Sequence, residues 1–456
     1  MIPSRGALPL LPLALLPLLT TACGEDQRTL TIEVIPGHET DAFHREPAVT
    51  RMEVAVVAPE GDVLTTAAAP PGGDLDFGEL PADVPLTFDI TGLDATGARV
   101  VRGRSVGGIV LGQLVGDLLP LFAQRLGTWS RPPGDLPSTR QGGVAFSVGT
   151  RFLALTGGAF EAESPAGTLG YDLLAWFGDR GITLPRAARS VVARGDAALL
   201  IDDVGASWFD FAGDRTVTTG LPAGLGSFAD VAAGRAIDAG DGRTFVVGGT
   251  RAAPESAAVL VVEADGSLRA AALSSPRAGA AAVWVEGVGL VIAGGSATAP
   301  GVEVLTGDGA VGIPRPFPED ATVGAGAVIG GLGDVVLMGG VLPDGSGAPT
   351  RRLSPSCATD CTVDEVEGAT LGAVVTGVAG FVLPGGRSIA VGNEAGSGAT
   401  RSFVVDLGGG AATEILLREP RRGATVVAAP NGTLAMMGGV LADGGAARTI
   451  EILFPE

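Results

Sequence analysis

The residue types that most often carry chemistry are scarce in this chain of 456 residues. Both histidines, His38 and His44, lie in the segment GHETDAFHRE together with Glu39 and Asp41. Imidazole and carboxylate groups are common metal ligands, so these four side chains form a candidate metal cluster. However, the five residues between the histidines place them on neither one helical face nor one strand face. The spacing favours a solvated loop between strands, and no metal is expected.

Cys23 is the first of three cysteines, and it ends the segment LLTTAC. Arg5 and an apolar run of 13 residues, Ala7 to Leu19, precede it. A run this short cannot cross ~30 Å of hydrocarbon as a helix, so residues 1–22 are predicted to be a cleaved signal peptide. The segment resembles the signal of bacterial lipoproteins, which implies acylation of Cys23 and a membrane anchor. Ordinary secretion with an unmodified Cys23 is the alternative. By resemblance to lipoprotein sorting, Gly24 implies the outer membrane, so the chain is expected in the cell envelope, periplasmic or surface-exposed.

With Cys23 assigned to the lipid, Cys357 and Cys361 remain as a pair. In an oxidising compartment such a pair is predicted to form a disulfide. Two cysteines with no histidine nearby make a poor metal site.

Acidic residues outnumber basic ones by 50 to 30, which gives a net charge of -20 and an isoelectric point near 4.5. This balance argues against nucleic acid as a partner, and against binding an anionic membrane by charge, because phosphates would be repelled. The 73 glycines and 31 prolines suit many short strands joined by tight turns.

Short apolar segments ending in paired glycines recur along the chain. The first residue of each terminal pair, weaker copies included, falls at positions 157, 202, 248, 294, 339, 392 and 438, in steps of 45, 46, 46, 45, 53 and 46. A repeat of this length suits one four-stranded propeller blade. In most repeats a third apolar segment ends at an acidic or glycine turn, which supplies the positive φ that a two-residue hairpin needs. The sequence therefore predicts an all-β fold with a seven-bladed β-propeller over residues 126–456.

The order of strand, paired glycines, strand, tight turn and strand resembles the kelch repeat, with Tyr171, Trp176 and Trp208 at its aromatic positions. The resemblance implies glycines where neighbouring blades approach closely. The last repeat, ending at TIEILFPE, is one strand short, and a spare strand around Leu126 to Ser130 precedes the first repeat. Donation of this strand to the last blade would remove two open edges and place Trp129 at the fourth-strand aromatic position.

Before the propeller, alternating apolar and polar residues in TLTIEVIP, RMEVAVVAPEG and PLTFDITGLDATGARVVRG are typical of half-buried strands. Residues 23–105 resemble the immunoglobulin-like or transthyretin-like β-sandwiches of bacterial surface lipoproteins, which implies a spacer domain. Residues 106–125 are either a linker or the last strand of that sandwich.

The inventory of side chains favours binding over catalysis. A kelch-type copper-radical oxidase needs histidines and two tyrosines in the propeller, which has no histidine and one tyrosine, Tyr171. The turn motifs of sialidases are absent, and a Ser-His-Asp triad cannot form there without histidine. Glycoside hydrolysis by paired carboxylates stays open, because acids such as Asp202, Asp203, Glu303 and Asp334 are present.

We therefore expect a non-catalytic protein-interaction module with no cofactor and an envelope protein as partner. A glycan-binding lipoprotein is the alternative; four tryptophans and one tyrosine are few for stacking on sugars. Calcium held by acidic turns is a third possibility, but no EF-hand spacing occurs. The sequence assigns no ligand-binding residue.

Overall fold

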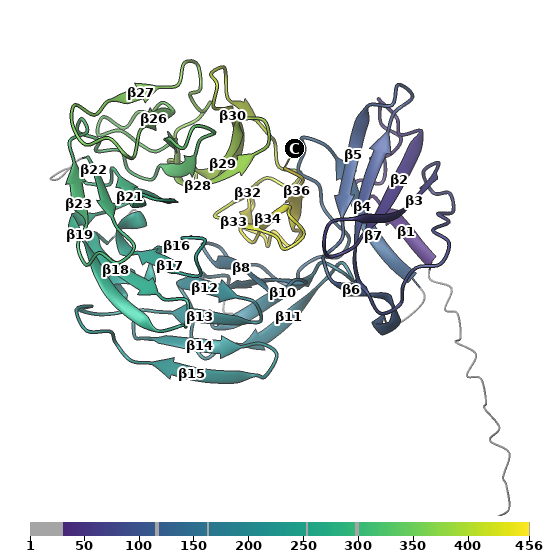
Figure 1. Cartoon of the computed structure of the whole chain (residues 1–456), viewed down its shortest axis with the longest axis horizontal. Coiled ribbons are helices and arrows are strands. Elements are labelled where there is room, and N and C mark those ends of the chain that lie inside the picture. The colour runs from purple at the N-terminus through teal and green to yellow at the C-terminus, as the bar shows by residue number, and fades with distance from the viewer. Residues whose placement is uncertain (1–30, 115–117, 162–163, 252–253, 297–300, 456) are drawn as a thin grey trace, which may run out of the picture.

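The computed structural model describes residues 31–114, 118–161, 164–251, 254–296 and 301–455, and Figure 1 shows a ring of small β-sheets with a further sheet beside it. Helical structure in these ranges is confined to α1 (Ala229–Ala232) and two 3-10 turns, η1 (Leu111–Gln113) and η2 (Gly248–Thr250). None of the helices in these ranges is long and apolar enough to cross a membrane. Cys23 and the predicted signal peptide lie outside the described residues.

Seven sheets form the blades of the ring, and each begins with the strand nearest the central axis (Figure 1). Within each blade the neighbouring strands are antiparallel. The predicted all-β, seven-bladed propeller is confirmed. The strands are, for blade 1, β8 (Val144–Val148), β9 (Phe152–Thr156), β10 (Gly167–Asp172) and β11 (Phe177–Thr183); for blade 2, β12 (Ser190–Arg194), β13 (Ala197–Ile201), β14 (Ala206–Asp210) and β15 (Arg215–Thr219); for blade 3, β16 (Arg235–Asp238), β17 (Thr244–Val247), β18 (Ser256–Val262) and β19 (Leu268–Arg277); for blade 4, β20 (Ala281–Val285), β21 (Gly289–Ala293), β22 (Val302–Leu305) and β23 (Ile313–Arg315); for blade 5, β24 (Gly326–Ile329), β25 (Val335–Met338), β26 (Arg351–Leu353) and β27 (Val363–Glu365); for blade 6, β28 (Val375–Leu383), β29 (Arg387–Glu394), β30 (Thr400–Asp406) and β31 (Thr413–Glu414); and for blade 7, β33 (Thr425–Ala428), β34 (Leu434–Met437) and β36 (Glu451–Leu453), beside the short pair β32 (Arg421–Arg422) and β35 (Val440–Leu441).

The glycines that end the second strands lie where adjacent blades meet. Gly157 has φ +65°, and a Cβ atom placed on it would lie 2.2 Å from the carbonyl oxygen of Ala188 at the start of blade 2. Gly438 has φ +72°, and its Cβ would lie 2.4 Å from the carbonyl oxygen of Arg140 at the start of blade 1. Only glycine suits both the left-handed backbone and the close approach. The repeat that first identified the blades is therefore a packing requirement.

The ring is closed by the segment that precedes blade 1. The backbone nitrogen of Ser130 donates to the carbonyl oxygen of Ile452 at 3.0 Å, and the nitrogen of Ile452 donates back at 2.8 Å. Trp129 is fully buried among apolar side chains of blades 6 and 7, and its Nε1 donates to Ser402 Oγ at 2.8 Å. The predicted contact with the last blade is present, but as one β-bridge at Ser130 and not as a strand, and the indole of Trp129 joins the last two blades.

The N-terminal strands form a single sheet in the order β1-β7-β5-β4-β2-β3, with β6 beside β4. Strands β1 and β7 are parallel, and the other pairs are antiparallel. The segment left open as linker or strand therefore contributes to this sheet. The strands are β1 (Thr31–Ile35), β2 (Arg51–Val57), β3 (Val63–Ala69), β4 (Pro85–Leu93), β5 (Arg99–Arg104), β6 (Ile109–Val110) and β7 (Leu118–Arg125).

The structure does not confirm the two packed sheets of the predicted sandwich. Connecting segments take the place of the second sheet: Phe43 and Phe77 pack on the apolar face, and the ring of Phe77 meets Phe88 edge-on at 6.3 Å. The alternation of residues was interpreted correctly as one buried face, since β2 and β4 alternate in burial. A period of two does not reveal what covers that face.

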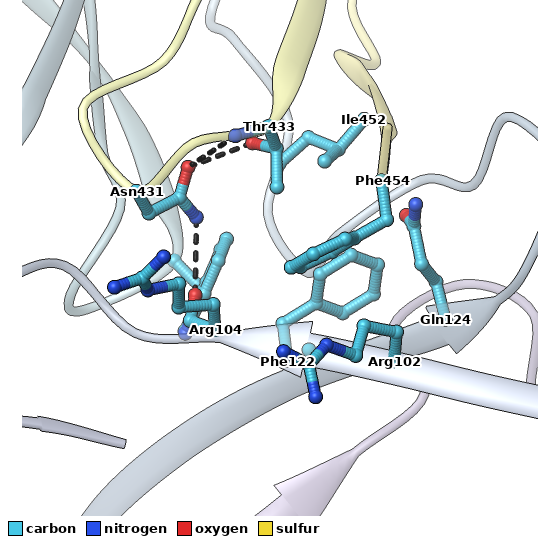
Figure 2. Close-up of a pocket in the computed structure, with 10 residues that line it drawn as sticks. Arg102, Arg104, Phe122, Gln124, Asn431, Thr433, Ile452 and Phe454 are labelled. Carbon is cyan, nitrogen blue, oxygen red and sulfur yellow. Dashed lines mark hydrogen bonds between the residues drawn. The ribbon is translucent and has the colours of Figure 1, made fainter. Parts of the chain in front are cut away.

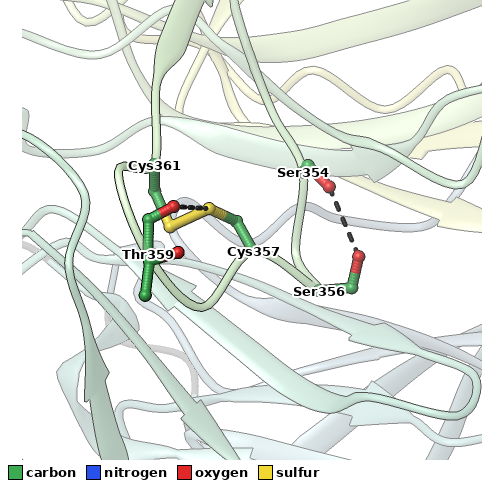
Figure 3. Close-up of a disulfide and its surroundings, with 5 residues drawn as sticks. All are labelled: Ser354, Ser356, Cys357, Thr359 and Cys361. Atoms are coloured by element: carbon green, nitrogen blue, oxygen red, sulfur yellow. Dashed lines mark hydrogen bonds between the residues drawn. A yellow bond between two sulfur atoms is a disulfide. The ribbon is translucent and has the colours of Figure 1, made fainter.

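The predicted disulfide is present in blade 5. Cys357 and Cys361 are joined in the connection between β26 and β27, with 5.7 Å between their Cα atoms (Figure 3). It closes a loop of a few residues, so the chain-entropy account gives it at most about 2 kcal/mol of stability.

Candidate functional site

The four side chains of the candidate metal cluster do not converge. His38 Nε2 lies 3.4 Å from Asp135 Oδ1, and Asp41 pairs with Arg45. In the ranges the structure describes, no group of three or more histidine, cysteine, aspartate or glutamate residues could hold a metal ion. His38 instead joins the N-terminal sheet to the entrance of the propeller.

Glu39 reinforces that junction. Its buried carboxylate accepts hydrogen bonds from the backbone nitrogen and from Nε of Arg131, at 2.8 and 2.9 Å. The segment around His38 therefore has a structural role at this junction, which its composition alone did not reveal.

A second set of contacts holds the N-terminal sheet against blades 1 and 7. The rings of Phe122 and Trp176 lie 5.3 Å apart. Asn431 Nδ2 donates to the carbonyl oxygen of Arg104 at 3.1 Å (Figure 2). The pocket between the two parts is only about 10 Å³. It is too small for a ligand, because even one water molecule needs about that volume.

A much larger cavity occupies the centre of the propeller, with a volume of about 580 Å³. This lies in the range of ligand-binding pockets, roughly 300 to 1,000 Å³. Residues of the inner strands β8, β12, β16, β28 and β33 line it, together with residues at the ends of neighbouring strands. We take this central channel as the candidate functional site.

Strand register shows that one position around the channel differs from its equivalents. In each blade, one inner-strand residue pairs with the residue just before the glycine pair or, in blades 2 and 6, before its weaker copy. Six of these seven residues are uncharged, and the arginine belongs to blade 3. They are Val144, Ser190, Arg235, Ala281, Gly326, Ala379 and Thr425.

Arg235 spans the channel. It begins β16 in blade 3, and its guanidinium NH1 donates a hydrogen bond to the carbonyl oxygen of Val378 in blade 6. In a ring of seven, no two blades are more than three positions apart, so this contact joins opposite sides. Burial and the nearby positive charge of Arg251 lower the pKa of Arg235 to about 10. Desolvation disfavours the charged form, and no carboxylate in the described chain pairs with this side chain.

Arg251 lines the same cavity and is half-buried. Its NH2 donates to the carbonyl oxygen of Arg189 at 3.1 Å. Its pKa is lowered by burial and by the charge of Arg189. The exposed Arg189 pairs with Asp203 at 2.5 Å, whereas Arg251 has no carboxylate partner among the described residues.

Three arginines that are almost fully buried elsewhere in the propeller have carboxylate partners. Arg277 pairs with Glu303 at 2.7 Å, Arg351 with Asp320 at 2.7 Å and Arg421 with Glu451 at 3.0 Å. Pairing a buried cation with a carboxylate offsets its desolvation. Arg235 and Arg251 are half-buried and form no such pair among the described residues, and the half-buried Arg194 and Arg418 likewise donate to backbone carbonyl oxygens.

The carboxylates considered for hydrolysis lie outside the cavity and are held by arginines. Glu303 is paired with Arg277, and Asp334 lies 2.5 Å from Arg352. Asp202 pairs with Arg186 at 3.0 Å, as Asp203 does with Arg189. All four carboxylates therefore form ion pairs with arginines of the propeller.

Hydroxyl, amide and backbone groups make up the remaining polar lining. Thr376 Oγ1 donates to the carbonyl oxygen of Asn393, and Thr400 Oγ1 donates to Asn393 Oδ1 at 3.0 Å. The residues that line the cavity in the described structure include no histidine, cysteine, aspartate, glutamate, lysine or tyrosine. The lining can hold a polar or anionic group but offers no general base at neutral pH.

The tryptophans lie away from the channel. Trp129 and Trp176 are buried; Trp208 and Trp284 are half-buried, and Trp284 stacks on Phe245 at 5.2 Å. None of the four belongs to the lining residues, so the cavity has no indole on which a sugar ring could stack.

Sequence reasoning missed Arg235 and Arg251. Arg235 could have been noticed by aligning the repeats on their glycine pairs, where the equivalent residues are small, aliphatic or hydroxylated. Arg251 follows Gly248-Gly249 in a part of the repeat that has no recurring residue pattern, so the sequence carried no signal for it.

No protein-family model matches the chain. No curated protein matches it either.

Three solved structures, all from Bacteroides thetaiotaomicron, are similar at 10% identity. One is described as the extracellular domain of a hybrid two-component system; the TM-score is 0.44, over 69% of this chain and 38% of that one. Another is described as the extracellular domain of a one-component system; its TM-score is 0.46, over 72% of this chain and 40% of that one. The third is described as a quinoprotein alcohol dehydrogenase-like protein; its TM-score is 0.41, over 84% of this chain and 94% of that one. The chain thus spans well under half of the first protein's length.

Proposed function

We propose that this chain is a lipid-anchored extracytoplasmic protein whose kelch-like propeller is a non-catalytic interaction module for an envelope protein. The observation that carries the proposal is the lining of the central channel. It combines a ligand-sized volume, hydroxyl and guanidinium donors and the absence, among the described lining residues, of groups that transfer protons at neutral pH.

The location is supported by two independent features of the chain. The N-terminal segment ending at Cys23 has the pattern of a lipoprotein signal. The disulfide between Cys357 and Cys361 suits an oxidising compartment outside the cytoplasm. Anchoring at the outer membrane follows from the same signal pattern and is part of the proposal.

A protein partner is favoured over a glycan because the channel lacks aromatic platforms. Phe146 is the one aromatic residue among the described lining residues. A sugar-binding site of this size relies on exposed aromatic faces, whereas guanidinium and hydroxyl groups suit the polar ends of a protein loop.

The test is site-specific photo-crosslinking on intact cells that express the full chain. A photoreactive residue replaces Ala236, which is exposed and lines the cavity, and in a control variant it replaces Thr216 on the exposed outer strand β15. We expect one dominant envelope protein to be captured from position 236 and not from position 216. If position 236 captured no protein and the purified chain were retained on envelope polysaccharide, the glycan alternative would replace the proposal.

A further inference from the structure

The central channel concentrates positive charge in a strongly acidic chain. The net charge is -20, yet Arg235 and Arg251 both line the cavity, and the charge of Arg251 acts on Arg235. Like charges at a half-buried site oppose each other and favour an anion between them.

Arg235 is held in a fixed direction with donors to spare. Its hydrogen bond to the carbonyl oxygen of Val378 fixes the guanidinium across the channel. A Cβ atom on Gly377 would lie 3.9 Å from Arg235 NH2, so the glycine leaves room beside that nitrogen. A guanidinium carries five N–H donors in a rigid fork, and this arrangement leaves most of them for a ligand.

We propose that the channel binds an anionic oxygen group, the chemistry shared by carboxylates and phosphates, between Arg235 and Arg251. The identity of its carrier rests on the proposed function: a carboxylate side chain of the partner protein. Thr250, which lies between the two arginines in sequence, also lines the cavity. Its hydroxyl is already engaged with the Val247 carbonyl oxygen, so the two guanidiniums carry the recognition.

Charge-assisted hydrogen bonds to a forked guanidinium are among the stronger polar contacts in proteins. Removal of either arginine is therefore expected to weaken binding by about tenfold or more. Added salt should also weaken binding, because it screens charges at a cavity open to solvent.

The experiment is calorimetric titration of the full chain, purified in detergent, with succinate and with inorganic phosphate as probes. The variants are Arg235→Gln and Arg251→Gln, and Arg215→Gln on the exposed strand β15 is the matched control with the same charge change. We expect saturable binding to the wild type and to the Arg215 variant, and a loss of about tenfold or more in each channel variant. Equal binding by all four proteins, equal loss in the Arg215 variant, or no binding to the wild type would overturn the inference.

Cross-linking from position 236 in the same variants separates the two sources of the anion. If both channel variants lose the probe anion and the captured partner, the carboxylate belongs to the partner. If they lose the probe anion but keep the partner, the site stands and its ligand is a free small anion. If the wild type binds the probe anion but captures no protein, the anion site stands and the proposed protein-binding function fails.

Discussion

Replacing Arg235 with methionine should stabilise the ligand-free protein. Burial and the charge of Arg251 lower the pKa of Arg235 to about 10, so keeping the guanidinium charged in the folded chain costs on the order of 3 kcal/mol. Partial exposure reduces this figure because solvent screens the charge. The donor is a charged guanidinium, so loss of its hydrogen bond to Val378 costs about 1.5 kcal/mol. The net expectation is a gain of about 1 kcal/mol in the free energy of unfolding.

The sign of the pH dependence follows from the same shift. Above about pH 10 the unfolded chain keeps a proton on Arg235 that the folded chain has released, so the free energy of unfolding rises with pH there. Below about pH 10 the full penalty is present. The advantage of Arg235→Met should therefore be largest at neutral pH and shrink above about pH 10.

The assay is urea denaturation at pH 7, with midpoint and slope compared between variants. Arg277→Met is the matched control, because Arg277 pairs at 2.7 Å with Glu303, whose side chain is fully buried. Leaving a buried carboxylate unpaired costs about 3 to 5 kcal/mol, so this variant should be destabilised. If Arg235→Met lost as much stability as Arg277→Met, Arg235 would be a strap between blades 3 and 6, and the reasoning would be refuted.

Two further predictions concern the ring itself. Trp129→Ala should lower the free energy of unfolding by about 3 to 5 kcal/mol, because removal of a fully buried indole leaves a cavity between blades 6 and 7. Denaturation and hydrogen exchange should show a larger loss of stability for this variant than for Trp208→Ala, whose indole is half-buried. Equal losses in the two variants would contradict the closing role of Trp129. Gly157→Ala should be destabilising by well over 1 kcal/mol, since its new Cβ would meet the Ala188 carbonyl oxygen at 2.2 Å. Gly195→Ala, also at positive φ but with nothing within 4 Å, should cost only about 1 kcal/mol in the same thermal or urea unfolding experiment. Similar losses for both glycines would mean that blade contact is not what requires Gly157.

The blades could be predicted because each is a local unit. Paired glycines such as Gly438-Gly439 mark a contact that recurs once per blade, so its spacing appears directly in the sequence. The closing role of Trp129 could be inferred as well, because a missing strand at one end and a spare strand at the other leave one economical solution.

The cover of the N-terminal sheet could not be predicted in the same way. Phe77 reaches Phe88 from a connecting segment with no periodic pattern, so the alternation in the strands gives no sign of it. The candidate site was missed for a related reason. Arg235 and Val378 are 143 residues apart, and their contact exists only because the ring places blades 3 and 6 opposite each other.

The bridge between Ser130 and Ile452 also delays closure of the ring until the end of the chain has been synthesised. The two residues are 322 positions apart (452 minus 130), so the closing segment leaves the ribosome long before its partner. At about 5 to 20 residues per second, that interval is roughly 16 to 64 s. During it the indole of Trp129 and an open strand edge have no final partner, a state that favours aggregation. The sheet containing β7, which ends at Arg125, is complete early and can anchor one end of the waiting segment. A nascent chain stalled before residue 452 would therefore have six complete blades, an incomplete seventh and an open ring.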